Sequence, residues 1–127
     1  MPFEFVFPDN VEPLAGERVF ARYPANRRQG ANNAVGGLLW LTSHRVLFTS
    51  HALDSRLGGK NWSTSRDNVV SADVVGLNLL EILGGGLRRR LKLELRVGKP
   101  EIFVVGQFSG PGNVDHIVLE FRSWILR

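Results

Sequence analysis

The sequence contains no cysteine, and this absence removes several classes of chemistry at once. Disulfide bonds, thiolate nucleophiles and zinc–thiolate centres all require cysteine. A chain without disulfides also fits a reducing compartment. We therefore expect a fold that is held together by its hydrophobic core, and a chain of 127 residues is long enough to form that core as a single domain.

Long apolar runs are missing as well. No stretch approaches the roughly 20 apolar residues that a membrane-spanning helix needs. The N-terminal sequence MPFEFVFPDN lacks the basic region and the long apolar run of a signal peptide. These absences predict a cytoplasmic protein whose association with a membrane, where it occurs, is peripheral.

Histidine is scarce, and its spacing argues against a metal site. His44, His51 and His116 show no H-x-x-x-H or comparable arrangement. Ser43 precedes His44 directly, but a serine nucleophile needs a base at hydrogen-bond distance and a third orienting group, and we expect adjacent side chains in a turn to point apart. No cluster of titratable residues suggests a matched acid and base. The sequence therefore predicts that the protein is not an enzyme and that it holds no metal or cofactor.

Charge is present but unevenly distributed along the chain. The formal net charge is +4, and arginine supplies 13 of the 16 basic residues. Residues 1–17 contain four acidic residues and no basic one, whereas residues 84–99 contain six basic residues and one glutamate. A basic excess of this kind favours an anionic partner.

Apolar residues alternate with polar ones over most of the chain, which is typical of half-buried strands. The strands expected from this pattern cover residues 16–23, 35–42, 45–51, 62–65, 68–80, 87–97 and 101–105. The polar, turn-rich segment 24–33 predicts a loop, and helical spacing predicts an amphipathic helix over 114–125. Residues 1–13 form an arm ahead of a domain at 14–127, and the alternating Phe3, Phe5 and Phe7 predict that the arm docks as an edge strand or at a partner surface.

The stretch GGLLWLTSHRVLFTS, residues 36–50, predicts a hairpin with Ser43 and His44 at its corner. Tight two-residue corners require positive φ, at which histidine is enriched. Arg45 is expected to brace Thr42 or a nearby backbone carbonyl instead of contacting a substrate. A slip of one residue would scatter the apolar side chains over both faces, so the pattern fixes the register. The register places these residues on one apolar face: Leu39, Leu41, Val46 and Phe48.

This hairpin resembles the signature hairpin of GRAM domains, which belong to the pleckstrin-homology-like superfamily. The matching positions are Gly37, Leu39, Trp40, Leu41, Thr42, Arg45, Val46 and Phe48. Weaker matches extend the resemblance over residues 14–127, through GERV, Trp62 with RDNVVSADV, and the closing VDHIVLEFRSWIL. The resemblance implies a mainly β fold: a partly open barrel of about seven antiparallel strands in two sheets, with a C-terminal helix that caps one end. It also implies a binding module and not a catalyst, with membrane lipids or proteins as partners.

Two groups of arginines are candidates for an anion or lipid site. Pleckstrin-homology domains use basic residues in the first strand–loop–strand, where this chain has Arg27 and Arg28 but no basic residue from position 29 to 44. The second group follows three glycines in GGGLRRR and comprises Arg88, Arg89 and Arg90. Guanidinium groups and exposed amides can together hold phosphate. Alternatively, Arg88 and Arg90 lie on the solvated side of the strand expected at 87–97.

Two other classes of partner are alternatives to an anionic ligand. The phenylalanines of the arm and the exposed strand edges of such a fold also suit a protein-interaction or self-assembly module. The basic strand carries charge that nucleic acid would attract, but no base-reading motif is present and no aromatic residues are interleaved with its arginines. Nucleic acid is therefore not the expected partner.

Overall fold

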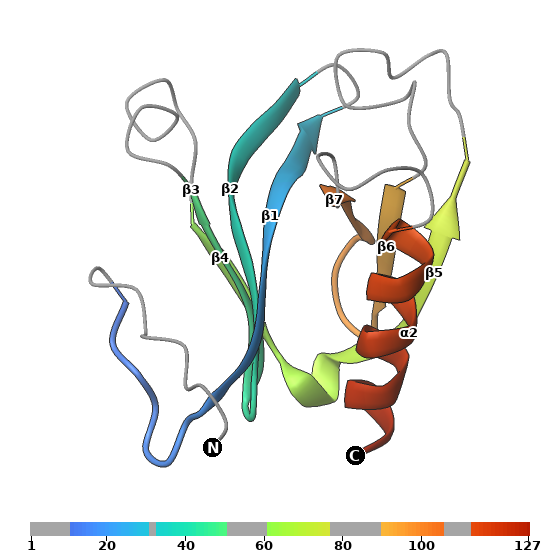
Figure 1. Ribbon diagram of the computed structural model, residues 1–127. Coiled ribbons are helices and arrows are strands. Elements are labelled where there is room, and N and C mark those ends of the chain that lie inside the picture. The colour runs from blue at the N-terminus through green and yellow to red at the C-terminus, as the bar shows by residue number, and fades with distance from the viewer. Residues whose placement is uncertain (1–10, 31–32, 51–60, 77–89, 106–112) are drawn as a thin grey trace.

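A computed structural model describes residues 11–30, 33–50, 61–76, 90–105 and 113–127 of the chain (Figure 1). The strands within these residues are β1 (Val19–Gly30), β2 (Asn33–Thr42), β3 (Arg45–Ser50), β4 (Trp62–Ser65), β5 (Val69–Val75), β6 (Arg90–Leu95) and β7 (Glu101–Val105). A short 3-10 helix, η1 (Arg66–Asn68), connects β4 to β5, and the helix α2 (Asn113–Leu126) closes the chain.

The seven strands form one antiparallel sheet in the order β4-β3-β2-β1-β7-β6-β5. The expected mainly β architecture with a C-terminal helix is confirmed. The two expected sheets are joined by β1, which pairs with β2 along its length and also with β7 at Ala25–Arg27. The sheet curls around a core and does not close, because β4 and β5 stand at its two ends.

The expected hairpin forms in the expected register. Leu41 pairs with Val46, and the pairing continues to Leu39 opposite Phe48. The four side chains of the predicted apolar face are buried in the core together with residues of β6, β7 and α2. Trp40 and Leu47, which pair on the opposite face, are also buried.

The expectation of a loop at 24–33 is wrong for most of that segment, because β1 continues to Gly30. Local turn signals such as Pro24 are overridden by pairing: the backbone from Val19 to Gly30 faces β2, and Ala25 is buried between two neighbouring strands. Pro24 is tolerated because it precedes the segment that is paired on both sides. The strand expected at 87–97 is described only from Arg90 to Leu95, and the one at 68–80 only from Val69 to Val75.

Helix α2 covers the core beside β5 (Figure 1). Its apolar stripe buries Ile117, Phe121 and Trp124, as the helical spacing predicts. Arg122 fastens the helix to β5, with its Nε donating to the carbonyl of Ala72 at 2.8 Å. The same guanidinium forms an ion pair with Asp73 at 2.9 Å.

The corner between β2 and β3 is held by the side chain of Thr42, which is fully buried. The Thr42 hydroxyl accepts hydrogen bonds from the backbone N–H groups of His44 and Arg45 at 3.1 and 3.0 Å. The positive φ expected at the corner is therefore wrong: no non-glycine residue in the described part of the chain has positive φ. A threonine side chain replaces the strained backbone turn.

Glu17 completes this corner cluster, which we define as Glu17, Thr42 and Arg45. Its carboxylate accepts a hydrogen bond from the Thr42 hydroxyl at 2.6 Å and a forked pair from Arg45 at 2.9 and 3.0 Å. The Glu17 side chain has no exposed surface. Burial alone would raise the pKa of the Glu17 carboxyl, but the hydrogen bonds from Arg45, from the Leu14 backbone and from Thr42 bring that pKa below its ordinary value.

Substitution Gly37→Ala tests how closely β2 and β3 pack. A Cβ at Gly37 would overlap the carbonyl oxygen of Thr49 and approach the Phe48 ring to 2.9 Å. Because the obstacle is backbone, we expect a loss of about 3 kcal/mol or more in the free energy of unfolding, measured by urea denaturation. Gly76→Ala is the matched control, since no atom lies within 4 Å of a Cβ at that position. Equal stability of the two variants would contradict this packing.

Substitution Glu17→Gln tests the corner cluster and its charge. Removing one partner of a buried pair leaves Arg45 without its carboxylate, so we expect a loss of about 3 kcal/mol at neutral pH. Because the pKa of Glu17 is lowered by folding, its contribution is present above the ordinary glutamate pKa and is lost as the pH falls below it. Urea denaturation of both proteins should therefore show a stability difference that shrinks from about pH 5 to pH 3. A difference that stays constant over this interval would refute the ionic role.

Candidate functional site

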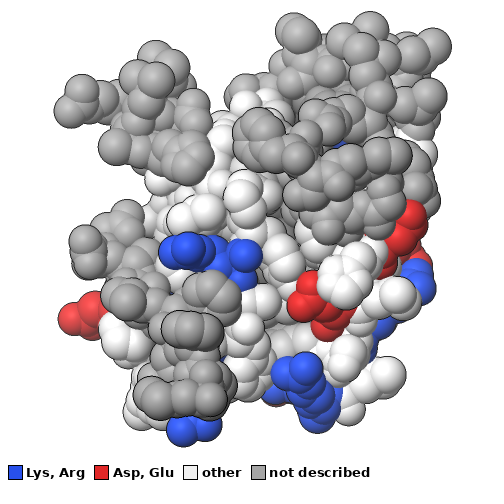
Figure 2. All heavy atoms as spheres, viewed as in Figure 1, with Lys and Arg blue, Asp and Glu red and all other residues white. Residues whose placement is uncertain are grey.

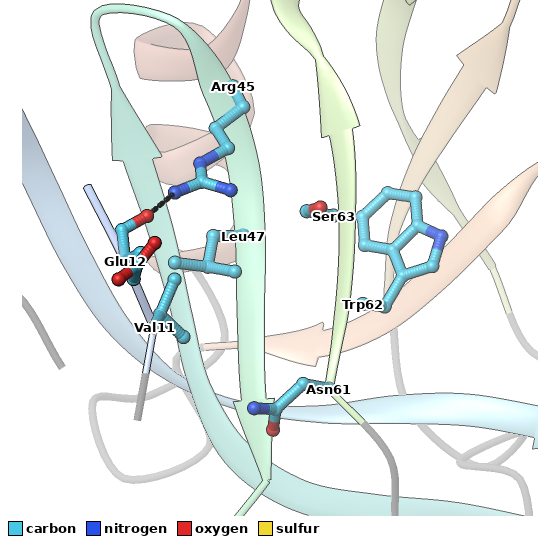
Figure 3. Close-up of a pocket in the computed structure, with 7 residues that line it drawn as sticks. All are labelled: Val11, Glu12, Arg45, Leu47, Asn61, Trp62 and Ser63. Atoms are coloured by element: carbon cyan, nitrogen blue, oxygen red, sulfur yellow. Dashed lines mark hydrogen bonds between the residues drawn. The ribbon is translucent and has the colours of Figure 1, made fainter. Parts of the chain in front are cut away.

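A groove lies between the end of the arm and the strands β3 and β4 (Figure 3). Its volume is about 330 Å³. Figure 3 shows the Val11 and Leu47 side chains on the arm side of β3, while the Trp62 ring points away from the arm. The residues that line this arm groove are Val11, Glu12, Arg45, Leu47, Asn61, Trp62 and Ser63.

The arm groove is fixed by contacts that begin at the corner cluster. Arg45 donates to the backbone carbonyl of Glu12 at 2.9 Å, so the expectation that it braces a backbone carbonyl is confirmed. A turn between Leu14 and Glu17 directs the arm back toward β1, with the Glu17 N–H donating to the Leu14 carbonyl at 3.0 Å. Gly16 takes a positive φ of 72° in this turn. The groove wall is therefore built from two segments that are far apart in sequence.

Arg27 does not face the solvent as a ligand-binding arginine would. Its Nε forms an ion pair with Glu101 at 2.8 Å, and both side chains are about 15% exposed. Its guanidinium also lies 5.3 Å from the centre of the Trp62 ring. Arg27 therefore joins β1, β7 and β4 across the inside of the barrel, and its charge is neutralised by Glu101.

The other predicted arginines are not gathered with Arg27. Arg28 follows it on β1, and consecutive residues of a strand point to opposite faces. Arg90 begins β6 and is 2% exposed, so the solvated position considered for it is wrong. The four residues from Ile102 to Val105 on the neighbouring strand are all buried, which shows that both faces of the sheet are covered there. Arg88 and Arg89 lie outside the described residues, and the assignment of these arginines to a ligand site stays a prediction.

Ser43 and His44 contact each other, which corrects the expectation that they point apart. The Ser43 Oγ lies 2.7 Å from His44 Nδ1 and accepts a hydrogen bond from the Arg18 N–H at 2.9 Å. Within the described ranges, no group of three or more His, Asp or Glu side chains could hold a metal ion. The pair serves the corner, and the third orienting group of a nucleophilic site is not seen there.

One end of the barrel gathers basic residues from four separate segments. The Arg66 N–H donates to the His44 carbonyl at 2.9 Å, which brings η1 to the β2–β3 corner. The Arg96 N–H donates to the Asn68 carbonyl at 2.8 Å, which brings the β6–β7 turn to η1. We call this surface the basic end, and its basic members are Arg18, Arg66, Arg96, Lys99 and Arg127.

Acidic residues contribute little to the basic end. Among the described residues of these segments, the acidic residues are Glu17, which is held in the corner cluster, and Asp67. Figure 2 shows blue Lys and Arg spheres and no red ones along the lower edge of the molecule, where Figure 1 places η1 and the end of α2. The guanidinium of Arg66 is held by carbonyl oxygens, at 2.6 Å from that of Trp124 and 2.9 Å from that of Arg127.

Large apolar side chains stand exposed among these charges. Val97 is 76% exposed, Leu126 is 86% exposed and Phe20 is 40% exposed. The Arg127 guanidinium lies 5.4 Å from the centre of the Phe20 ring, so the apolar and basic groups are neighbours. Sequence reasoning missed this surface because its members are single residues at the ends of different elements.

The fold is similar to several solved structures. The N-terminal PH domain of Vps36 matches with a TM-score of 0.61 and 12% identity, over 91% of this chain and 83% of that one. A C-terminal domain of an unknown protein from Leishmania infantum matches with a TM-score of 0.60 and 14% identity, over 89% and 88%. The hSac2 domain from the human phosphoinositide phosphatase Sac2 matches with a TM-score of 0.56 and 15% identity, over 93% and 70%.

These matches show that the chain has a PH-like fold. No model of a protein family matches the chain, and a search of curated proteins finds no relative. Within the described residues, no helix has the length and apolar character needed to cross a bilayer. A fold does not determine a ligand, so any ligand has to be inferred from the surface.

A double-mutant cycle with Arg27→Ala and Glu101→Ala tests whether Arg27 is structural. Because the pair is mostly buried, we expect a coupling free energy of about 1–2 kcal/mol in urea denaturation. The more exposed pair Lys92–Glu94, 2.9 Å apart, is the matched control, and its coupling should stay below about 0.5 kcal/mol. Similar coupling free energies in both pairs would contradict a structural role for the Arg27–Glu101 ion pair.

Proposed function

We propose that the chain is a non-catalytic adaptor of PH type, with a hairpin like that of GRAM domains, which attaches to anionic lipid surfaces through its basic end. The observation that carries this proposal is the charge of that end. Five basic residues come together with one acidic residue, Asp67, and with three exposed apolar side chains. Basic groups beside exposed apolar groups are what an anionic bilayer surface binds.

The strength of such binding follows from the number of charges. Each Lys or Arg close to an anionic leaflet contributes about 1 kcal/mol, so five residues give weak to moderate and salt-dependent attachment. Val97 and Leu126 can add apolar burial at the lipid interface, because they stand exposed at this end. An adaptor that attaches and releases needs affinity of this order.

The arginines singled out from sequence support this function less well. The charge of Arg27 is paired with Glu101, and Arg90 is buried. Arg28, Arg88 and Arg89 stay candidates for a second anion site. The two locations can be separated by experiment because their residues do not overlap.

Protein interaction is the second candidate function. The arm groove and the edge strand β4 beside it favour this alternative, since an extended segment can pair with a strand at the edge of a sheet. This alternative needs no lipid.

The double substitution Arg96→Gln with Lys99→Gln tests the basic end. Losing two surface charges should weaken binding to vesicles of phosphatidylcholine and phosphatidylserine by about 30-fold at low salt. Co-sedimentation measures the binding, and vesicles of phosphatidylcholine alone provide the baseline.

The matched control is Arg88→Gln with Arg89→Gln, which removes the same charge from the site predicted by sequence. We expect this variant to bind like the unaltered protein. A loss confined to the control variant would move the site to residues 88–90. No binding by the unaltered protein would reject the lipid function altogether.

A further inference from the structure

Strand β4 has a strand neighbour on one side only within the described residues. It stands at the end of the sheet order and pairs with β3 from Arg45 opposite Ser65 to Phe48 opposite Trp62. Half of its backbone N–H and C=O groups therefore face away from β3. An edge of this kind is a template for a further strand.

The sequence of β4 does little to protect this edge. Proteins commonly guard edge strands with lysine, proline, a bulge or short length. The strand reads Trp-Ser-Thr-Ser, without charge or proline, and its pairing with β3 shows no register shift. Of these features, β4 has the short length, because it contains four residues. The arm groove opens beside this edge, with Ser63 exposed in its wall.

The chain supplies a segment that suits the edge. Residues 1–10 lie outside the described part, and they join the structure at Val11, which lines the arm groove. Phe3, Phe5 and Phe7 alternate with Glu4 and Val6, which is the pattern of a strand with one apolar face. At about 3.3 Å per residue, five residues match the length of β4.

The direction of the arm also fits. The described arm passes from Val11, which faces Leu47 across the arm groove, to Glu12, whose carbonyl accepts a hydrogen bond from Arg45. It therefore runs in the same direction as β4, in which Ser63 faces Leu47 and Ser65 faces Arg45. The sequence Pro-Asp-Asn at 8–10 is a turn signal. A reversal at these residues makes residues 3–7 antiparallel to β4, which is the pairing used throughout this sheet.

We propose that the segment Phe3–Phe7 docks on the β4 edge of its own chain as an additional antiparallel strand beside the arm groove. The occupant is the chain's own arm, because a three-residue connection to Val11 gives it a far higher effective concentration at this edge than a second molecule can reach. This inference does not depend on lipid binding. It identifies the β4 edge as a strand-docking surface that the arm fills.

Disulfide trapping in the full-length protein tests this proposal. Because the sequence has no cysteine, the introduced pair is the only one that can form a disulfide. Ser63→Cys is combined in turn with Glu4→Cys, Phe5→Cys and Val6→Cys. A disulfide needs Cα atoms about 4.4–6.8 Å apart, so adjacent strands bring at least one pair into range. We expect that pair to oxidise at least about tenfold faster than the same arm cysteine combined with Val70→Cys on β5. Non-reducing electrophoresis should show a monomer.

Two results would overturn the proposal. The first is that none of the three pairs oxidises faster than its Val70→Cys control. The second is that the disulfide links two chains, because the β4 edge would then receive the arm of another molecule. In the fastest pair, replacing by alanine those of Phe3, Phe5 and Phe7 that do not carry the cysteine should slow trapping to the control rate, while the far-ultraviolet circular dichroism stays unchanged.

Discussion

The buried hydroxyl of Thr42 is the interaction on which the rest of the structure depends. It accepts the backbone N–H groups of His44 and Arg45 and donates to the carboxylate of Glu17, so one side chain fixes the hairpin corner and the arm together. The Thr42 carbonyl accepts a hydrogen bond from the Trp124 indole at 2.7 Å, which adds helix α2. Segments separated by up to 82 residues in sequence are thus joined at one residue. The arm groove and the basic end both take their geometry from this point.

Local pattern predicts the parts of this fold whose apolar residues alternate. The hairpin register from Leu39 to Phe48 follows from the pattern because a one-residue shift would expose a whole core face. The extension of β1 past Pro24 could not be predicted in the same way. Its turn-forming residues are held extended by β2 and β7, and pairing between distant strands leaves no periodic signal in a short polar segment. The partner of Arg45 was missed for the same reason, since Glu17 precedes it by 28 residues.

The candidate sites show the same difference between proximity in sequence and proximity in space. Arg88, Arg89 and Arg90 attract notice because they are consecutive, yet Arg90 is buried and alternation sends Arg27 and Arg28 to opposite faces. The basic end draws on residues that sit where elements begin or end. In an antiparallel sheet every second turn falls at the same end, so this surface could have been predicted from the strand order together with the charges at each turn. The strand order itself needs the long-range pairing of β1 with β7.

What holds an arginine decides whether its charge is available to a partner. Arg27, Arg45 and Arg122 are held by the carboxylates of Glu101, Glu17 and Asp73, which cancel most of their field. Arg66 and Arg96 are held by backbone carbonyl oxygens, which fix the guanidinium in place and leave its net charge intact. A count of charges along the sequence treats both groups alike. Arg66 and Arg96 therefore contribute uncancelled charge at the end of the barrel where exposed apolar side chains also lie.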